Sequence, residues 1–374
     1  MRISCDTTKP AHATIKPIST ETYLVKDEGV ISIQTIPLTE IQKQVAVLQI
    51  AERFFDSVTL FALFETGVFK VLSFGPKSLQ EIQERIRGNE ETLRATLDAA
   101  VALKLVTLQD GRYGANESLL DCLGREDASA YLGEWVTFLH ALMPPLAQLG
   151  DAIRTGSTPG ALFESMSGDS VPARRMTGAM DAYARSRGVE IADRLDFSKT
   201  RRLLDLGCGP GTYSLAIVER NPNVRATLLD LPGPIAEARR LAATRKMEDR
   251  LEFIAADAKH YTTDQPFDTI LVSNTLHMIG PAGSVELLKH CFQLLLPGGR
   301  LIIQAQYLND DRVSPRWPTL LNLIQRVATP GGRNHTINET KEWMEEAGFQ
   351  NVHHIHLSVW NVCSCLLGER PLSS

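Results

Sequence analysis

The sequence has few cysteines, and only Cys363 and Cys365 lie close together. Its cysteines are Cys5, Cys122, Cys208, Cys291, Cys363 and Cys365, and no two of them form a CxxC pair. Zinc sites and disulfide frameworks depend on close cysteine spacing, so we expect neither, and a reducing, cytoplasmic compartment fits these thiols best. No group of histidines and carboxylates has the spacing of metal ligands either, so we expect no metal.

The sequence also lacks an excess of positive charge. Its 374 residues include 39 basic and 44 acidic side chains, which gives a net charge of -5. Proteins that bind nucleic acid by neutralising phosphates carry a basic excess, so nucleic acid is not an expected partner. A long apolar run is missing too, because Glu52, Arg53, Asp56 and Glu65 interrupt the apolar stretch 45–71. A spanning helix needs about 20 consecutive apolar residues, so we expect no membrane association.

The first 38 residues lack the apolar core of a secretory signal, and we interpret residues 1–38 as a flexible leader. Their Ser, Thr and basic residues leave an organellar transit peptide as the alternative, which their acidic residues weaken. At roughly 150 residues per domain, the length of the remaining chain predicts two domains.

Apolar residues recur at helical steps from Ile41 to Ala62, on two faces of one helix that Gly67 is expected to end. A helix that is apolar on both sides must be covered on both sides. This pattern indicates either deep burial or a partner subunit, and we expect a homodimer.

Helix, turn, helix and hairpin follow, and together they predict a winged-helix unit. Ser78 and Glu81 form a capping box at the start of the first helix, and Asp110 with Gly111 is a hairpin turn. Such a unit can place a helix in the major groove of DNA, but the charged residues of these two helices sum to one net negative charge. We therefore interpret residues 39–190 as a helical, winged-helix-like dimerisation domain.

From Thr200 onward, apolar strands alternate with helices, which is typical of a parallel α/β sheet. Residues 191–374 are therefore predicted to form a second, α/β domain. Its sheet is expected to end in an antiparallel hairpin near residues 352–366.

The first predicted strand of this domain runs into a glycine-rich turn. Gly207, Gly209 and Gly211 lack a Cβ, so the backbone can approach a ligand at the strand end, where α/β sheets bind ligands. Asp205 lies inside the same turn. Its carboxylate would attract an ammonium group and repel a pyrophosphate, so the turn indicates a ligand with an ammonium group.

Acidic or polar residues also end the next three predicted strands. Asp230 ends the second strand, where a carboxylate can accept both hydroxyls of a ribose. Asp257 ends the third strand and can accept from an adenine amino group, and Ser273 with Asn274 ends the fourth. Such residues at four neighbouring strand ends predict one ligand site at one edge of the sheet.

The segments DLGCGPG, LLDLP, AADAKHY and SNTLH resemble the motif series of class I S-adenosylmethionine-dependent methyltransferases. From about residue 40 to 370, the chain resembles the two-domain small-molecule O-methyltransferases, which include caffeate, acetylserotonin and bacterial polyketide enzymes. The resemblance implies a Rossmann-like α/β domain behind an N-terminal, mostly α winged-helix dimerisation domain. It also implies S-adenosyl-L-methionine as cofactor and, as acceptor, a hydroxyl of a small aromatic or polyketide-like molecule.

The resemblance assigns cofactor contacts by position. The expected cofactor-binding residues are Asp205, Gly207 and Gly209 for the methionine part, Asp230 for the ribose, Asp257 and Ala258 for the adenine, and in addition Leu231 and Ser273.

His277 falls where the family has its catalytic base. A neutral imidazole, with a reference pKa of about 6.5, can take a proton from a hydroxyl as the oxygen attacks the sulfonium methyl. The chain departs from the family here, because Met278 replaces the usual Asp and the two supporting carboxylates fall at Gln304 and Asn334. Amides can orient an imidazole but do not stabilise imidazolium by a full charge. His277 is then either a base for an acidic acceptor or a polar residue that only shapes the pocket, and His335 is the alternative base.

The family's acceptor pocket corresponds to segments that contain Phe163 and Trp317 in this chain. We expect the pocket to be lined by Met176, Met180, Asn274, Gln304 and Asn334. A C- or N-methyltransferase of the same fold and a cofactor-binding protein without catalysis remain alternatives. A nicotinamide-dependent dehydrogenase would share the glycine turn and Asp230, but it would not explain Asp205 or Asp257.

Overall fold

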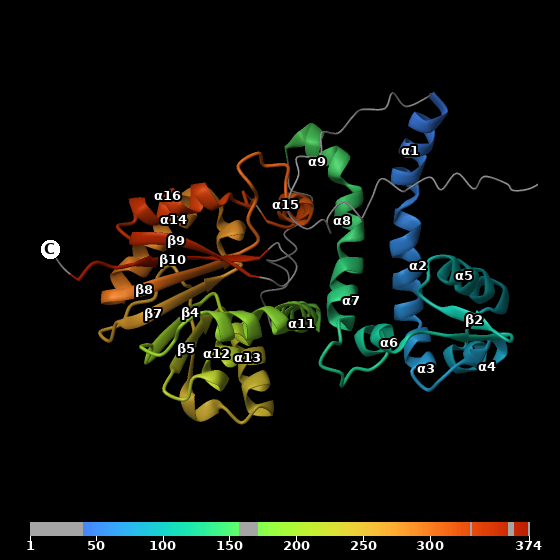
Figure 1. Ribbon diagram of the computed structural model, residues 1–374, viewed down its shortest axis with the longest axis horizontal. Helices are drawn as coiled ribbons and strands as arrows, with labels where there is room; N and C mark the ends of the chain where they lie inside the picture. Colours follow the sequence, from blue (N-terminus) through green and yellow to red (C-terminus); the bar gives the residue numbers. More distant parts are fainter. Residues whose placement is uncertain (1–39, 157–170, 330, 358–362, 373–374) are drawn as a thin grey trace, which may run out of the picture. The chain divides into compact units, whose positions relative to one another are not determined.

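The computed structural model describes residues 40–156, 171–329, 331–357 and 363–372 (Figure 1). The predicted leader 1–38 and the predicted pocket residue Phe163 lie outside the described residues. The chain divides into two compact units, which are the residues up to Leu60 and the residues from Phe61 onward.

The N-terminal unit is helical, but it does not begin with the single helix that the sequence predicted. Helix α1 spans Glu40–Glu52 and α2 spans Phe54–Glu65, with a break at Arg53. The amide of Arg53 bonds to the carbonyl of Ile50 at 3.4 Å, a spacing of three residues that tightens the helix locally. Apolar periodicity continues across one tightened turn, so the sequence contains no signal for the break. The predicted end at Gly67 is confirmed, because its φ of 78° is left-handed.

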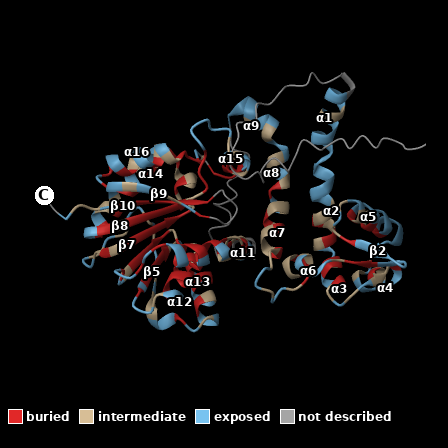
Figure 2. Ribbon diagram, viewed as in Figure 1, coloured by how far each residue is buried: buried red, intermediate tan, exposed pale blue. Residues whose placement is uncertain are grey.

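Apolar side chains on α1 and on the first part of α2 are exposed to solvent, and Figure 2 shows α1 and α2 mostly in pale blue. Their accessible fractions lie between 42% and 66%, too much for a covered face. These side chains are Val47, Leu48, Ile50, Phe54, Phe55 and Val58.

The predicted helices and hairpin follow. The elements are α3 (Val68–Leu72), β1 (Lys77–Ser78), α4 (Leu79–Ile86), α5 (Glu90–Ala102), β2 (Thr107–Gln109) and β3 (Arg112–Gly114). The Ser78 and Glu81 capping box is present in both directions, and Asp110 and Gly111 have the positive φ angles of a hairpin turn. The three strands form a small sheet in the order β1-β3-β2.

Helices make up the next segment. They are α6 (Glu117–Leu123), α7 (Gly133–Ala141), α8 (Met143–Ala147), α9 (Leu149–Thr155) and the long α11 (Val171–Arg194). The sequence predicts a break at Pro144 and Pro145, and α7 indeed ends just before them, while the prolines themselves lie in the first turn of α8. Proline is tolerated there because the first helical amides have no intrahelical acceptor.

The α/β part of the chain contains a seven-stranded sheet in the order β6-β5-β4-β7-β8-β10-β9. Its strands are β4 (Arg202–Leu206), β5 (Arg225–Asp230), β6 (Leu251–Ala255), β7 (Phe267–Ser273), β8 (Leu295–Ala305), β9 (Gln350–His356) and β10 (Ser364–Glu369). Strands β4 to β8 pair in parallel, whereas β10 is antiparallel to both β8 and β9. The predicted parallel sheet and its antiparallel end are therefore confirmed.

Helices cover both faces of this sheet, and Figure 2 shows the strands mostly as buried. Helix α11 packs on one face with α12 (Thr212–Arg220) and α13 (Pro232–Thr244). Helices α14 (Leu276–Leu294) and α16 (Ile337–Glu346) pack on the other face, and α15 (Arg316–Ala328) packs against α7, α8 and α11. The short 3-10 helix η2 (Glu248–Arg250) leads into β6. In the part of the chain that the structure describes, no helix is both long and apolar enough to cross a membrane.

Candidate active site

The polar residues predicted at the strand ends lie at one edge of the sheet. Asp230 is the last residue of β5 and Ser273 the last of β7, while Asp257 follows β6 by two residues. Asp205 is the penultimate residue of β4 and pairs in register with Leu228 of β5. Because these strands are parallel, their carboxyl ends bring the four side chains to the same edge.

The glycine turn after β4 adopts a backbone that favours glycine. Gly207, Gly209 and Gly211 have φ angles of 75°, 54° and 75°. A Cβ on Gly207 would lie 2.8 Å from the Thr275 hydroxyl oxygen, and one on Gly211 would overlap Leu228. A Cβ on Gly209 would meet nothing within 4 Å. Packing therefore demands glycine at 207 and 211, whereas Gly209 borders open space that a ligand can enter.

Asp205 is a buried carboxylate with one unsatisfied oxygen. The residue is 1% exposed, and its Oδ2 accepts a hydrogen bond from the Ser214 hydroxyl at 2.6 Å. Its Oδ1 has no partner among the described residues. Burial raises the pKa of this carboxyl to about 7. A buried acceptor without a partner is costly, so a ligand ammonium group fits this position.

Asp230 closes the other side of the glycine turn. Its two carboxylate oxygens accept from the amides of Gly209 and Leu231, each at 2.7 Å. Each oxygen keeps a lone pair, so the carboxylate can still accept the two hydroxyls of a ribose. Burial raises the pKa of Asp230. Leu231 caps α13 without a side-chain hydrogen bond, and its exposed side chain can cover a flat ring.

Asp257 is exposed and accepts a hydrogen bond from the amide of Lys259 at 2.9 Å. This bond is the main cause that lowers the pKa of Asp257, and His260 at 3.2 Å adds to it. Ala258 packs partly buried against the core beneath. An exposed carboxylate at a strand end can still accept from an adenine amino group.

Two amide side chains pair between β7 and β8. The Asn274 amide nitrogen donates to the Gln304 carbonyl oxygen at 2.7 Å and to the Tyr213 hydroxyl at 3.2 Å. The Asn274 oxygen and the Gln304 nitrogen are both buried without partners, and so is the hydroxyl of Ser273. Asn274 also has a left-handed φ of 50°, so the chain is strained at this strand end.

His277 lies in the first turn of α14 and is neutral. Burial, with a smaller contribution from His335, lowers the pKa of its imidazole to about 3. Among the described residues, none forms a hydrogen bond to this ring. The Asn334 side chain instead donates to the carbonyl of Pro318 at 2.7 Å, and Gln304 accepts from Asn274. The two amides at the carboxylate positions are therefore held by other partners.

His335 is buried beside this turn. Neither of its ring nitrogens has a partner of hydrogen-bond geometry, although the nearby Leu276 carbonyl favours the protonated ring. Burial outweighs that effect and lowers the pKa of His335 to about 4. Its ring meets the Trp343 ring edge-on, with the centroids 4.7 Å apart.

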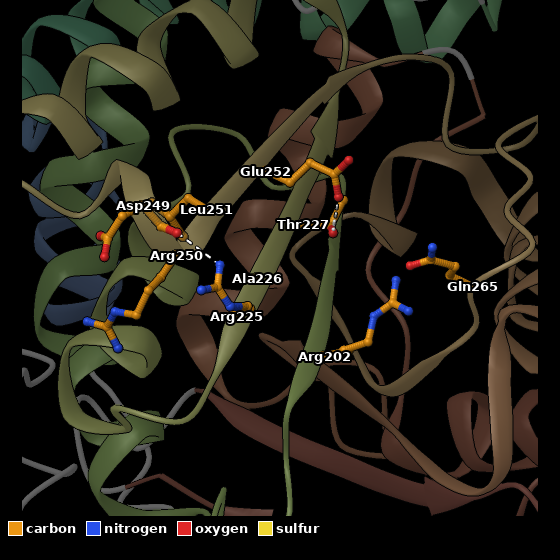
Figure 3. A pocket seen from close by; sticks show the side chains of 9 residues that line it. All are labelled: Arg202, Arg225, Ala226, Thr227, Asp249, Arg250, Leu251, Glu252 and Gln265. Atoms are coloured by element: carbon orange, nitrogen blue, oxygen red, sulfur yellow. Dashed lines mark hydrogen bonds between the residues drawn. The ribbon is translucent and has the colours of Figure 1, made fainter.

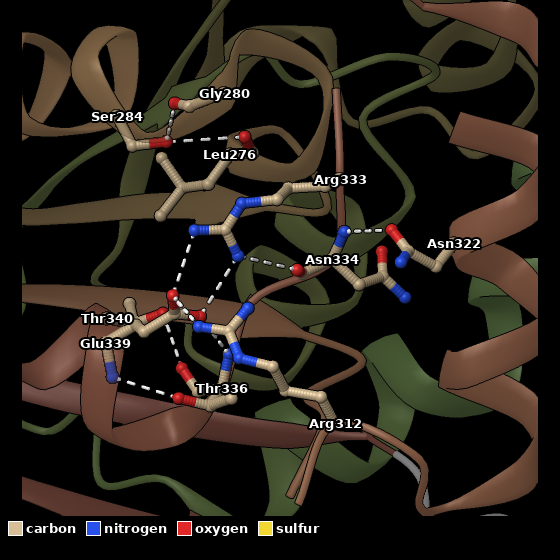
Figure 4. Close-up of polar contacts among 10 residues, drawn as sticks. All are labelled: Leu276, Gly280, Ser284, Arg312, Asn322, Arg333, Asn334, Thr336, Glu339 and Thr340. Carbon is tan, nitrogen blue, oxygen red and sulfur yellow. Dashed lines mark hydrogen bonds and ion pairs between the residues drawn. The ribbon is translucent and has the colours of Figure 1, made fainter. Parts of the chain in front are cut away.

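One carboxylate fixes the segment that carries Asn334 and His335 (Figure 4). Glu339 accepts two hydrogen bonds from Arg333, at 2.9 and 3.1 Å, and another from Arg312. It also accepts from the amide of Thr336 at 3.0 Å and so closes the capping box of α16. Burial alone would raise the pKa of Glu339, but these donors lower it to about 2.

Two glycines let this segment lie directly against the turn after β7. A Cβ on Gly332 would lie 2.8 Å from the His277 carbonyl oxygen, and one on Gly280 would lie 3.0 Å from the Gly331 carbonyl oxygen. Gly280 has φ 68° and ψ 175°, and the helical geometry of α14 breaks at this residue. Close backbone approach at these glycines places His335 beside His277.

The predicted pocket residues Met176 and Met180 lie on α11. Both are partly buried against a cluster that includes Leu142, between α7 and α8, and Ile324 of α15. Trp317 of α15 donates its indole N–H to the Tyr183 hydroxyl at 3.4 Å. Sequence reasoning missed Tyr183, although it follows Met180 by three residues and so shares its helix face.

The unpaired buried polar atoms concentrate at this edge. In the described ranges, ten buried side-chain nitrogen and oxygen atoms have no hydrogen-bond partner, and seven of them belong to residues at the carboxyl ends of the strands or to His335. These residues are Asp205, Ser273, Asn274, Gln304, Gln306 and His335. Buried polar groups are normally satisfied, so this concentration makes the edge the candidate ligand site.

A separate cavity of about 290 Å³ lies at the opposite edge of the sheet (Figure 3). Arg202, Arg225 and Leu251, the first residues of β4, β5 and β6, line it. The glycine turn and the polar strand ends do not contribute to it, so it lies apart from the candidate site.

Comparison with known proteins agrees with this geometry. A family model described as the O-methyltransferase domain matches residues 147–350. The tetracenomycin polyketide synthesis 8-O-methyl transferase TcmO of Streptomyces glaucescens is 28% identical over 322 residues, covering 84% of this chain and 94% of that protein. The 3-hydroxy-5-methyl-1-naphthoate 3-O-methyltransferase of Streptomyces sahachiroi is 26% identical over 300 residues, with coverages of 79% and 86%. A crystal structure of human N-acetylserotonin methyltransferase in complex with S-adenosylmethionine has a TM-score of 0.79 at 20% identity, with coverages of 88% and 98%.

The strand order and the family match define the class, a Rossmann-like methyltransferase that uses S-adenosyl-L-methionine. The matched model covers more than half of the chain, and the chain therefore belongs to the O-methyltransferase domain family. Its activity is S-adenosylmethionine-dependent O-methyl transfer, which sets aside the dehydrogenase alternative.

Proposed function

We propose that the residues at the carboxyl edge of the sheet bind the cofactor and present its methyl group to a hydroxyl of a small aromatic or polyketide-like molecule. The concentration of unpaired buried polar atoms at this edge carries the proposal. Asp205, Gly207 and Gly209 would hold the methionine part, and Asp230 the ribose. Asp257 and Ala258 would hold the adenine, with Leu231 and Ser273 beside the nucleoside. TcmO and the naphthoate methyltransferase, whose names specify polyketide and aromatic substrates, support the acceptor class.

The cofactor supplies an electrophilic sulfonium methyl group. The chain's part is to position the acceptor oxygen in line with that methyl group and to receive the hydroxyl proton. Positioning alone can supply a large share of the rate. Asn274 and Gln304 each present an unpaired buried amide atom at this place, which suits them to hold the acceptor.

His277 is the proposed proton acceptor. Its imidazole is neutral at every pH above about 4, so a ring nitrogen is free to take the proton. The low pKa makes it a weak base, and the expected acceptor is therefore acidic, such as an activated phenol or an enol. His335 shares the low pKa and has less access to solvent, so it ranks second.

Replacement of His277 tests its catalytic part. His277→Ala should lower kcat roughly 10²-fold at pH 7, the low end of general-base effects, because the ring is a weak base. The measurement is the initial rate of methyl transfer, with the affinity for S-adenosylhomocysteine as control. Near-wild-type turnover with normal cofactor binding would show that His277 only shapes the pocket.

Thermal unfolding with ligands tests cofactor binding. S-adenosylhomocysteine at 100 times its Kd should stabilise the chain by about 2.7 kcal/mol, whereas NAD should have no effect. Wild type and Asp205→Asn are compared at the same pH. If S-adenosylhomocysteine leaves the wild-type curve unchanged, the assignment of the cofactor site is wrong.

We further propose a homodimer formed through the N-terminal helices. The support is the exposed apolar side chains of α1 and α2, which a second copy can cover. Residues 39–190 would then serve as the winged-helix-like dimerisation domain and residues 191–374 as the catalytic domain. The net negative charge of helices α4 and α5 favours this role over DNA binding.

A further inference from the structure

Two amide side chains are joined at the carboxyl ends of β7 and β8. The backbone amide of Asn274 donates to the Gln304 backbone carbonyl at 2.9 Å, and its side-chain nitrogen donates to the Gln304 side-chain oxygen at 2.7 Å. The same nitrogen donates to the Tyr213 hydroxyl at 3.2 Å. These bonds use both hydrogens of the Asn274 side-chain nitrogen, so the pair is held in place by the chain itself.

One donor and one acceptor of this pair are left over. The Asn274 Oδ1 and the Gln304 Nε2 are buried, and neither has a partner among the described residues. Gln304 is 0% exposed, so its nitrogen is not solvated at the surface. The left-handed φ of 50° explains an asparagine at position 274, because asparagine tolerates this backbone. It does not explain the unpaired nitrogen of Gln304.

This remainder does not depend on how the two amides are oriented. If both are turned over, the Gln304 nitrogen donates to the Asn274 oxygen, which also accepts from the Tyr213 hydroxyl. The Asn274 nitrogen and the Gln304 oxygen are then free, which is again one donor and one acceptor. Turning over only one amide would place two nitrogens or two oxygens 2.7 Å apart, and the hydrogen bond would be lost.

The order of the strands places this pair on the acceptor side of the site. Strands β6, β5 and β4 lead to the residues proposed for the adenine, the ribose and the methionine part, and β7 and β8 come next in the sheet. Neighbouring strands lie about 4.8 Å apart. The amide pair therefore lies beyond the methionine part, on the side where the acceptor meets the methyl group.

A hydroxyl is the smallest group that satisfies both free atoms. Its hydrogen can go to the free amide oxygen, and its oxygen can accept from the free amide nitrogen, in either orientation of the pair. The reacting hydroxyl does not fit this role, because it must give up its proton and an amide oxygen is not a base at working pH. A hydroxyl held by the pair therefore keeps its proton.

We propose that Asn274 and Gln304 are specificity-determining residues that bind a second hydroxyl of the methyl acceptor, which stays unmethylated. The preferred acceptor is then an aromatic diol, and the reaction stops at its monomethyl ether. The reacting hydroxyl gives its proton to His277, as proposed above. This inference rests on the proposed function and deepens it by naming the substrate class.

Acceptors that differ at one ring position test the proposal. One series is 2,3-dihydroxynaphthalene, 3-methoxy-2-naphthol and 2-naphthol, and the other is 1,3-dihydroxynaphthalene, 3-methoxy-1-naphthol and 1-naphthol. The methoxy group keeps the oxygen but not the donated hydrogen, and the naphthols lack both. In at least one series, the wild-type kcat/KM should fall about tenfold for each hydrogen bond lost. Mass spectrometry should find one methyl group on the diol. Equal kcat/KM values within both series, or a dimethylated diol as main product, would overturn the proposal.

Gln304→Met tests the residue, because methionine keeps the length of the side chain and removes the amide. The preference for the diol over the naphthol should fall about tenfold, and this ratio cancels any general loss of activity. Gln325→Met is the matched control. Gln325 is 2% exposed on α15, and its Oε1 accepts from the Thr329 hydroxyl at 3.1 Å. The control should keep the wild-type ratio. An unchanged ratio in Gln304→Met, or the same loss in both variants, contradicts the proposal.

Two further measurements separate other occupants of the amide pair. If wild type prefers 3-hydroxy-2-naphthamide to 2,3-dihydroxynaphthalene, the pair binds an amide and the hydroxyl proposal is wrong. If Gln304→Met weakens S-adenosylhomocysteine binding but keeps the acceptor ratio, the pair belongs to the cofactor site and the proposal is equally wrong.

Thermal unfolding of wild type decides the matter where no compound is methylated or Gln304→Met does not fold. In the presence of S-adenosylhomocysteine, a diol should raise the Tm more than the matching naphthol at the same concentration. Equal shifts in both series would overturn the proposal. Failure of S-adenosylhomocysteine itself to stabilise the chain would instead overturn the proposed function.

Discussion

Burial of Asp205 couples cofactor binding to pH. In the ligand-free chain its pKa is raised to about 7, and a ligand ammonium group favours the charged carboxylate. Below pH 7, binding must therefore release a proton. We expect the affinity for S-adenosylhomocysteine to rise by up to about tenfold per pH unit between about pH 5 and 7 and then to level off. Isothermal titration calorimetry across this range measures it.

Asp205→Asn is the control for this pH dependence. The variant should bind S-adenosylhomocysteine at least about tenfold more weakly at pH 8 and with a flat pH profile. The raised pKa also means that the folded chain binds more protons than the unfolded chain between about pH 4 and 7, so wild-type stability falls as pH rises through this window. Without ligand at pH 8, the variant should therefore be the more stable protein. A pH-dependent affinity that survives the substitution would place the titrating group elsewhere.

At the scale of the elements, the glycines in the turn between β4 and α12 have different roles: one is required by packing and another by ligand binding. Gly211→Ala would force a Cβ into Leu228 at a left-handed φ, so we expect a loss of about 2 kcal/mol or more in the free energy of unfolding. Gly209→Ala meets only open space and should cost about 1 kcal/mol for its left-handed backbone. It should weaken cofactor binding more than it weakens the fold, because its methyl group enters the ligand's space.

Denaturant unfolding and calorimetry of the same two variants separate these effects. The expected order is that Gly211→Ala is the less stable variant and that Gly209→Ala, although folded, has the larger loss of S-adenosylhomocysteine affinity. Normal binding by Gly209→Ala would mean that the ligand does not pass over this glycine.

The hydrogen bonds that Glu339 accepts hold α16, the segment 331–336 and Arg312 together on one side of the site. Its pKa falls from 4.5 to about 2, which corresponds to a contribution of about 3 kcal/mol to the stability of the folded chain. Because the folded pKa is depressed, this contribution is complete above about pH 4.5 and disappears as pH falls toward 2. Glu339→Gln should therefore lower the free energy of unfolding at pH 7 and differ less from wild type as the pH is lowered.

Glu346→Gln is the matched control for Glu339→Gln. Glu346 lies on the same helix, and its ion pair with Lys289 at 2.8 Å is exposed. Exposed ion pairs contribute little, so this variant should unfold close to wild type. Similar losses in both variants would show that the Glu339 network contributes no more than a surface ion pair.

Regular elements could be predicted because their signals are local. The parallel strands, the Ser78 capping box and the Asp110 turn follow from apolar runs and turn chemistry, and the four polar strand ends follow from the topology of parallel strands. The break at Arg53 could not be predicted, because one tightened turn leaves the apolar period intact. The hydrogen bonds from Asn334 to the Pro318 carbonyl and from Trp317 to the Tyr183 hydroxyl join segments that no periodicity in the sequence relates. The family resemblance predicted the cofactor and the position of His277. That its ring is buried and neutral depends on the residues packed around it in the folded chain, which the sequence alone does not reveal.

At the scale of the whole molecule, the exposed apolar side chains of α1 and α2 predict self-association. Phe54 and Phe55 are 52% and 58% exposed, and a charge at either position would be buried in a dimer without a partner. Phe55→Asp should weaken the dimer at least about tenfold without lowering the helical content. Sedimentation equilibrium over a range of chain concentrations measures the dissociation constant.

Phe74→Asp is the control for this experiment. Phe74 is 70% exposed and belongs to neither α1 nor α2, so the substitution adds the same charge outside the two helices of the proposed interface. It should leave the dimer intact. A wild-type chain that stays monomeric at all concentrations, or a dimer that tolerates Phe55→Asp, would exclude the N-terminal helices as the interface.

The place of β10 in the sheet has a consequence for synthesis on the ribosome. β10 follows β9 along the chain, yet it lies between β8 and β9 and bonds to both. As the nascent chain emerges, β9 therefore has no strand to join, and the edge of β8 stays open until residues 364–369 have been made. Open strand edges favour pairing with other chains, so the nascent protein is most exposed to aggregation just before its last strand is inserted. Closure of the sheet therefore waits until residues 364–369 have left the ribosome.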